Sequence, residues 1–92
     1  MPITITFDAA KRDRTLHERG LDFADAALVF EGLTATIEDD RRPYPEARYI
    51  TAGVLGGRVV VIVWTPQEDG RRVISMRHAH ERESKRWFDR MG

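Results

Sequence analysis

Residues 48–77 read RYITAGVLGGRVVVIVWTPQEDGRRVISMR. The double glycine at 56–57 is typical of a two-residue β-hairpin turn between two β-rich runs. A second turn, ending in Asp-Gly, leads into a third run over 71–77. Because short turns join neighbouring antiparallel strands, this stretch predicts a β-meander. The run over 58–65 is apolar on both faces and is therefore expected to be the central strand.

The last run also predicts which side chains share a face. Strict alternation places Ile74 and Met76 on one face of the sheet. The same alternation places Val73, Ser75 and Arg77 on the other face. Arg77 is thus expected to point away from the side that holds Met76.

Two helices are expected before the meander. Alternation over 3–7 predicts a short first strand. Asp8 then caps a helix over 9–19, which is polar apart from Leu16 and is expected on the surface. Gly20 ends that helix. A second helix, capped by Asp22, is predicted to bury a stripe of residues at helical spacing. The stripe consists of Phe23, Ala26, Ala27 and Phe30.

The remaining elements complete the fold class. A further strand is expected over 34–38, followed by a polar, proline-containing loop. A last helix is predicted over 81–91, with one stripe of residues at positions i, i+3, i+4 and i+7. The stripe consists of Ser84, Trp87, Phe88 and Met91. The sequence therefore predicts a single α+β domain over 1–92: an antiparallel sheet meander with two N-terminal helices and one C-terminal helix.

Composition narrows the class of protein. The 92 residues carry 15 basic and 15 acidic side chains, so the formal net charge is zero and a strongly basic polyanion binder is excluded. Without cysteine there is no disulfide framework and no thiolate site. No apolar run approaches the ~20 residues of a membrane span, and the N-terminus does not resemble a secretory signal. We expect a cytoplasmic protein without a metal site, a cofactor or a membrane partner.

The neutral total hides a segregation of charge. Segment 18–46 has three basic and eight acidic residues, a net charge of −5. Segment 71–92 has seven basic and three acidic residues, a net charge of +4. A cationic segment can face phosphates, because the local potential steers a polyanion. Arg82 and Arg86 are candidate RNA-binding residues in this segment, although a surface helix also needs solubilising charge.

Candidate chemistry gathers near residue 80. Arginine binds phosphate through two parallel hydrogen bonds, and histidine titrates near neutrality. Arg77, His80 and Glu83 could therefore cleave RNA by attack of its own 2′-hydroxyl on the adjacent phosphate. Each residue also has a purely structural interpretation: Arg77 as a surface strand residue, and His80 and Glu83 as polar residues at a helix start.

The ordered motifs resemble the BrnT-family toxins. The opening Phe7-Asp8-Ala9-Ala10-Lys11, Gly20 and the segment FADAALVF at 23–30 resemble the start of that family. The segment EARYITAG at 46–53 and the valine-rich run after it resemble the middle strands. The segment RVISMRHA at 72–79, with Glu83 and Trp87, resembles the end. The likeness covers almost the whole chain.

This resemblance implies a ribonuclease toxin of a type II toxin–antitoxin pair with a RelE-like fold. Such toxins inhibit translation and are neutralised by a BrnA-like antitoxin, whose ribbon-helix-helix domain binds operator DNA. Lys11, Arg48, Arg77 and Glu83 occupy matching positions. The resemblance thus implies that Arg77 and Arg48 bind phosphate and that Lys11 positions the RNA backbone, with Glu83 and His80 as candidate proton carriers.

Three departures from the family pattern bear on activity. A Lys-His-Gly of the family is Glu18-Arg19-Gly20 here, so a histidine is lost. His80 stands where Thr or Asn is usual, and Trp87 stands where Tyr is usual. Trp87 is expected to pack in the core. His80 is a candidate replacement for the lost histidine.

Three functions remain open at this stage. The first is a metal-independent endoribonuclease toxin. The second is a non-catalytic module that binds the antitoxin as a corepressor subunit, which the change at Glu18 and Arg19 favours. The third is a stand-alone nucleic-acid-binding domain, which fits the basic C-terminal segment but explains less of the ordered likeness.

Overall fold

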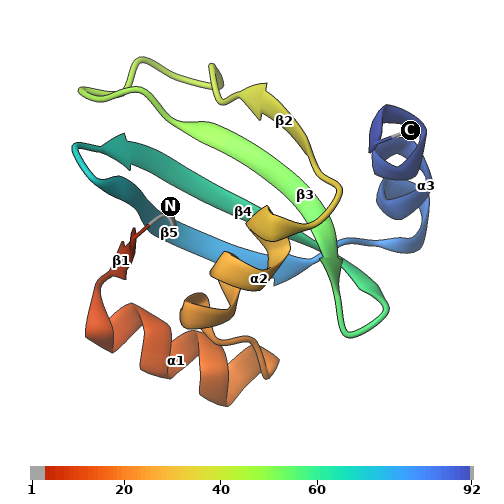
Figure 1. Ribbon diagram of the computed structural model, residues 1–92, viewed down its shortest axis with the longest axis horizontal. Coiled ribbons are helices and arrows are strands. Elements are labelled where there is room, and N and C mark those ends of the chain that lie inside the picture. The colour runs from red at the N-terminus through yellow and green to blue at the C-terminus, as the bar shows by residue number, and fades with distance from the viewer. Residues whose placement is uncertain (1–3, 92) are drawn as a thin grey trace.

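The structure is a computed structural model that describes residues 4–91. Ile3, which the sequence places in the first strand, lies outside the described residues. Figure 1 shows one curved sheet with two helices below it and a third at its far end. The elements are, in chain order, β1 (Thr4–Phe7), α1 (Ala9–Arg19), a 3₁₀ turn η1 (Phe23–Asp25), α2 (Ala26–Glu31), β2 (Ala35–Glu38), β3 (Tyr49–Leu55), β4 (Arg58–Gln67), β5 (Gly70–His78) and α3 (Glu81–Met91).

The sheet has five strands in the order β1-β5-β4-β3-β2. Strands β2 to β5 form the predicted antiparallel meander, with β4 at its centre. Both glycines of the β3–β4 turn have positive φ, at 59° and 79°, as a turn of this kind requires. The expectation of an antiparallel sheet is wrong for one pair, since β1 lies parallel to β5. No tight turn joins β1 to β5, so the rule that a hairpin makes its two strands antiparallel does not apply to this pair.

The first helix confirms its predicted boundaries. A carboxylate oxygen of Asp8 accepts the backbone N–H of Lys11 at 3.0 Å. Gly20 closes the helix at φ 69°, where its N–H donates to Leu16 O at 3.0 Å. Among its residues none is buried, which confirms a surface helix.

The second predicted helix is divided. Asp22 caps a single 3₁₀ turn, and the α-helix begins only at Ala26. The tighter first turn changes the buried set, because 3₁₀ and α geometry differ in residues per turn. Phe23 and Ala26 are buried as predicted, Ala27 and Phe30 are partly buried, with Phe30 packed against the same core, and Val29 is a further buried residue.

A hydrophobic core fills the space between η1, α2 and one face of the sheet. Gly53 of β3 allows the close approach of α2, because a Cβ there would lie 2.5 Å from Val29 Cγ1. Trp64 donates its indole N–H to Thr51 Oγ1 at 2.8 Å, and the Thr36 hydroxyl bonds to the same oxygen. Polar atoms inside this core are thus satisfied.

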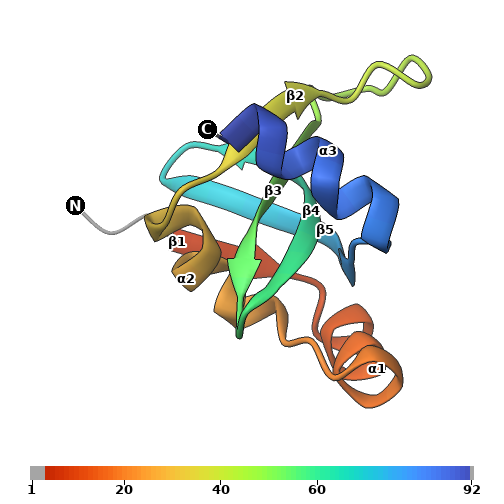
Figure 2. The same ribbon diagram turned by 90° about the vertical axis from the view of Figure 1, so that its right-hand side faces the viewer.

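A second, smaller core lies on the opposite face, under α3. Trp87 and Met91 are buried there against the central strands, which confirms the core position of Trp87. The prediction for Phe88 is wrong: its side chain is 53% exposed. In Figure 2, α3 crosses the sheet on the side of β2 and β3, so it covers this face only in part.

A β-bulge in β5 corrects the predicted facing of that strand. Trp64 pairs with Val73 and Val63 pairs with Ser75, which leaves Ile74 as an extra residue. Val73 therefore joins Met76 in the first core, contrary to strict alternation. Arg77 points away from Met76 as predicted, since it pairs with Val61 of the second core.

Candidate functional site

The centre of the candidate site is an ion pair at the junction of β5 and α3. Arg77 Nη1 donates to Glu83 Oε1 and Arg77 Nη2 donates to Glu83 Oε2, each at 2.7 Å. The planar guanidinium thus meets the carboxylate in a two-pronged fork. The side chain of Glu83 is 18% exposed and that of Arg77 is 41% exposed, so the arginine is the accessible member.

Glu83 also builds the start of α3. Its Oε1 accepts the backbone N–H of His80 at 3.1 Å, and the Ser84 N–H donates to His80 O at 2.7 Å. A glutamate at the third helical residue commonly bonds back to the N-cap in this way. One carboxylate therefore fixes both the helix start and the guanidinium of Arg77.

The charges of this pair stabilise each other. Hydrogen bonds from Arg77, and next from the His80 N–H, lower the pKa of Glu83 to about 2. Its carboxylate raises the pKa of Arg77, while partial burial of the guanidinium and, to a smaller extent, repulsion from Arg41 in the β2–β3 loop oppose that rise. At neutral pH Glu83 is a carboxylate with little affinity for a proton, which suits it to hold Arg77.

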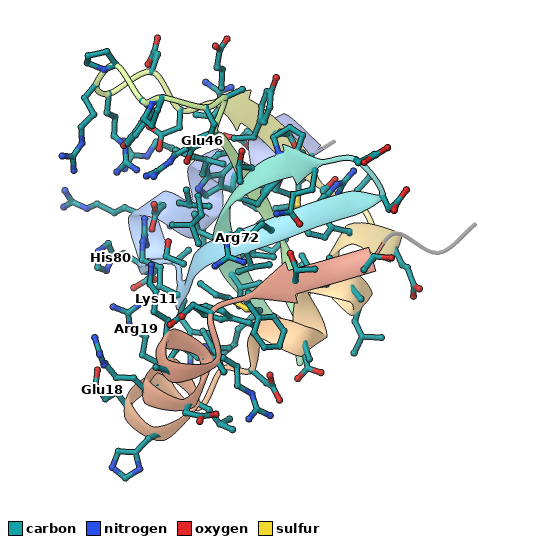
Figure 3. The ribbon with its side chains drawn as sticks, turned by 90° about the vertical axis from the view of Figure 1, so that its left-hand side faces the viewer. Lys11, Glu18, Arg19, Glu46, Arg72 and His80 are labelled. Carbon is teal, nitrogen blue, oxygen red and sulfur yellow. The ribbon has the colours of Figure 1, made fainter. Side chains whose placement is uncertain are left out.

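His80 sits beside this pair with its side chain exposed. Only its backbone is used in the helix cap, so the imidazole remains accessible. Figure 3 shows His80 on the same side of the molecule as Lys11 and Arg19. The structure thus places an exposed imidazole at the residue whose backbone N–H donates to Glu83, the partner of Arg77.

Lys11 belongs to a separate hollow of about 290 Å³ between α1 and β5. Arg19, at the position of the histidine lost from the family pattern, lines the same hollow. Its Nη1 donates to the backbone oxygen of Met76 at 3.0 Å. That oxygen belongs to the part of the β5 edge beyond Phe7, where β1 ends.

Arg48 lies at the end of the β2–β3 loop. Its guanidinium donates to Glu46 Oε1 at 3.3 Å and stacks 4.0 Å from the ring centroid of Tyr44. The backbone N–H of Asp39 donates to Arg48 O, which extends the β2–β3 ladder by one residue. The described contacts of Arg48 are therefore with its own loop and not with Arg77 or Glu83.

Arg82 and Arg86 both lie exposed on α3. They form no ion pair within residues 4–91. The helix carries them on its solvent side, while Trp87 faces the core. They remain candidate phosphate contacts.

Sequence reasoning missed the loop pair of Asp39 and Arg41. The Asp39 side chain is fully buried and accepts from Arg41 Nε and Nη2 at 2.7 and 2.8 Å. These hydrogen bonds lower the pKa of Asp39 to about 2. The adjacent acidic and basic residues looked like a solvated loop, and only the fold shows that one of them is buried.

Comparison with known proteins gives one family. A family model described as "Ribonuclease toxin, BrnT, of type II toxin-antitoxin system" matches residues 7–83 of the 92-residue chain. The matched range includes Arg77, Glu83 and the whole sheet except the first residues of β1. A search of curated proteins finds no match. No helix within residues 4–91 has the length and hydropathy to cross a membrane.

Proposed function

The chain belongs to the BrnT ribonuclease toxins of type II toxin–antitoxin systems, and from this premise we propose that it is a metal-independent endoribonuclease. It acts in the cytoplasm and inhibits translation by cutting RNA. The observation that carries the proposal is the fork between Arg77 and Glu83, which holds an accessible guanidinium in one orientation. A fixed cation of this kind suits a phosphate that gains charge in the transition state.

The proposed reaction is a transesterification within the RNA. The 2′-oxygen forms a bond to the adjacent phosphorus as the bond from phosphorus to the 5′-oxygen breaks. The products are a 2′,3′-cyclic phosphate and a free 5′-hydroxyl. A base takes the proton of the 2′-hydroxyl, and an acid supplies a proton to the departing 5′-oxygen.

The residues divide these tasks by their geometry. Arg77 stabilises the charge of the phosphorane, and Glu83 positions Arg77. His80 is the candidate proton carrier, because its imidazole is exposed beside the pair while Glu83 is held as a carboxylate. Lys11 and Arg48, with Arg82 and Arg86, bind the RNA backbone on either side.

The proposed partner is a BrnA-like antitoxin with a ribbon-helix-helix domain. A protein antitoxin follows from membership of a type II family. The toxin reaches operator DNA only through that antitoxin. Gel-shift assays with operator DNA test this point: the complex should retard the DNA, and the toxin alone should not.

Growth and total RNA after induction of the chain alone test the nuclease. The wild-type protein should arrest growth and fragment RNA, and Arg77→Ala should do neither while remaining folded. Arg90→Ala, which removes an exposed cation from the last turn of α3, is the matched control and should remain toxic. Full toxicity of Arg77→Ala would remove Arg77 from the site.

A second function is a corepressor subunit that binds the antitoxin without cutting RNA. Arg19 favours it, because this residue bonds the backbone of β5 at the position of the family histidine. Normal growth and intact RNA, with soluble wild-type protein present, would support this function over the nuclease.

A further inference from the structure

Two cations of strand β5, one near each end, lie on the second face of the sheet. Helix α3 covers this face only in part. Arg77 lies near the end of β5 that leads to α3, and Arg72 lies near its beginning. With regular alternation, residues five positions apart point to opposite faces. The bulge at Ile74 adds one residue, so Arg72 and Arg77 point to the same face.

The strand register confirms this common face. Arg77 pairs with Val61 and Arg72 pairs with Thr65, and the two partners are four residues apart on β4. Four residues of strand span about 13 Å at about 3.3 Å per residue. One phosphate is too small to bridge the two backbone positions, so Arg72 marks a separate place on the face.

Arg72 is flanked in the sheet by two threonines. Its neighbours across the sheet are Thr65 on β4 and Thr6 on β1. The Thr6 hydroxyl donates to Gln67 Oε1 at 2.7 Å, and the Thr65 hydroxyl donates to Ala47 O at 2.6 Å. Arg72 is half-buried and forms no ion pair with any residue of the described range 4–91. Figure 3 shows Arg72 on β5, between Glu46 above it and Lys11 below it.

By its backbone position, Arg48 lies beside Thr65 on the β3 side of β4, whereas Arg72 lies beside Thr65 on the β5 side. Tyr49 packs in the first core and pairs with Trp64. The residue before Tyr49 therefore lies next to Thr65 and points to the opposite face. The bond from Thr65 to Ala47 O agrees with this placement. The backbone of Arg48 thus lies beside Thr65, while its guanidinium pairs with Glu46 and stacks on Tyr44 of its own loop.

We propose that Arg72 and Arg48 form a second phosphate subsite, and that a single strand of RNA runs along β5 from this subsite to Arg77. The inference rests on the proposed nuclease function and gives its substrate a direction on the protein. It also explains how a chain with no net charge binds a polyanion, since the cations of this face act locally.

Binding of a 2′-O-methyl RNA 12-mer tests the subsite, because this probe lacks the attacking hydroxyl and cannot be cut. Affinity is measured for the wild-type protein, Arg72→Gln and Arg90→Gln over a series of salt concentrations. One lost phosphate contact lowers the slope of log K against log salt by about 0.7 for a single strand. We expect that loss for Arg72→Gln, and wild-type behaviour for Arg90→Gln.

The outcomes separate this inference from the proposed function. Wild-type affinity and slope for a folded Arg72→Gln variant would overturn the subsite, even if the wild-type protein cuts RNA. Absence of binding by the wild-type protein at low salt would overturn it as well. Binding that depends on Arg72, without cleavage of unmodified RNA, would support the subsite and contradict the nuclease.

Discussion

Arg77 and Glu83 meet through two hydrogen bonds of 2.7 Å, one from each terminal nitrogen of the guanidinium to each oxygen of the carboxylate. Glu83 thereby uses both oxygens on one partner and still accepts the N–H of His80. The orientation of Arg77 is fixed by the same contact that begins α3. The orientation of the proposed phosphate-binding arginine and the cap of α3 therefore depend on the same carboxylate.

Replacement of Arg77 by lysine tests the need for the fork. Lysine keeps the positive charge but is a point donor and cannot meet a carboxylate or phosphate with two parallel bonds. We expect Arg77→Lys to fold and to cut RNA roughly 10²–10³-fold more slowly, the usual effect of losing one oriented donor. Cleavage of a fluorogenic oligonucleotide measures the rate. Arg90→Lys is the control, and an unchanged rate in Arg77→Lys would show that charge alone suffices.

Acid should weaken the protein through Glu83. The pKa of Glu83 falls from an ordinary 4.5 to about 2 in the folded chain, so the folded state binds its proton less readily than the unfolded state. The stabilisation is complete above about pH 4.5 and is lost as the pH falls towards 2. Urea midpoints between pH 5 and 2.5 should fall less steeply for Glu83→Gln than for the wild-type protein. Glu81→Gln, which removes a carboxylate from the same helical turn, should leave the slope unchanged.

His80 can be changed without loss of the helix cap. Asparagine is a favoured N-cap residue, and Glu83 accepts the backbone N–H of position 80 and not its side chain. If His80 moves the proton, His80→Asn should fold normally and lower the cleavage rate roughly 10²–10⁴-fold. The pH–rate profile should lose the arm that depends on this group. A wild-type rate and profile would assign proton transfer to another group.

The buried contact between Trp64 and Thr51 should be costly to remove. Thr51 is 1% exposed and accepts the indole N–H, so Thr51→Val leaves that donor unsatisfied. The expected loss is about 1–3 kcal/mol of unfolding free energy. Thermal melts should detect it, since 1 kcal/mol shifts Tm by about 4–8 °C in a domain of this size. Thr36→Val is the control: Thr36 is exposed, so its replacement should cost less.

Local signals predicted most of the elements. The Asp8 cap, the Gly20 stop and the turn at 56–57 are short-range features, and each lies where the sequence placed it. The antiparallel order of β2 to β5 also follows from short connections. The parallel pairing of β1 does not, because contacts over more than 60 residues decide it.

The candidate site was predictable only in part. Arg77 and Glu83 were found by residue type and spacing, while their fork depends on how β5 meets α3. The bulge at Ile74 leaves no sign in the sequence, since the run RRVISMR alternates well without it. Strict alternation places Arg72 and Arg77 on opposite faces, so the sequence did not predict that they share a face. A single inserted residue in a ladder changes which cations share a face.

Arg19 hydrogen-bonds a backbone carbonyl on the outer margin of the sheet, at the exposed edge of β5. Strand β1 stops at Phe7, opposite Val73, and beyond it the carbonyl of Met76 is taken by the Arg19 side chain. A bare strand margin offers backbone groups to any other extended chain and so promotes aggregation. Here the Arg19 guanidinium bonds one of those carbonyl groups, and α1, the charged helix that carries Arg19, lies beside this margin. The residue that stands in place of the family histidine thus leaves one fewer backbone acceptor on this margin for pairing with another extended chain.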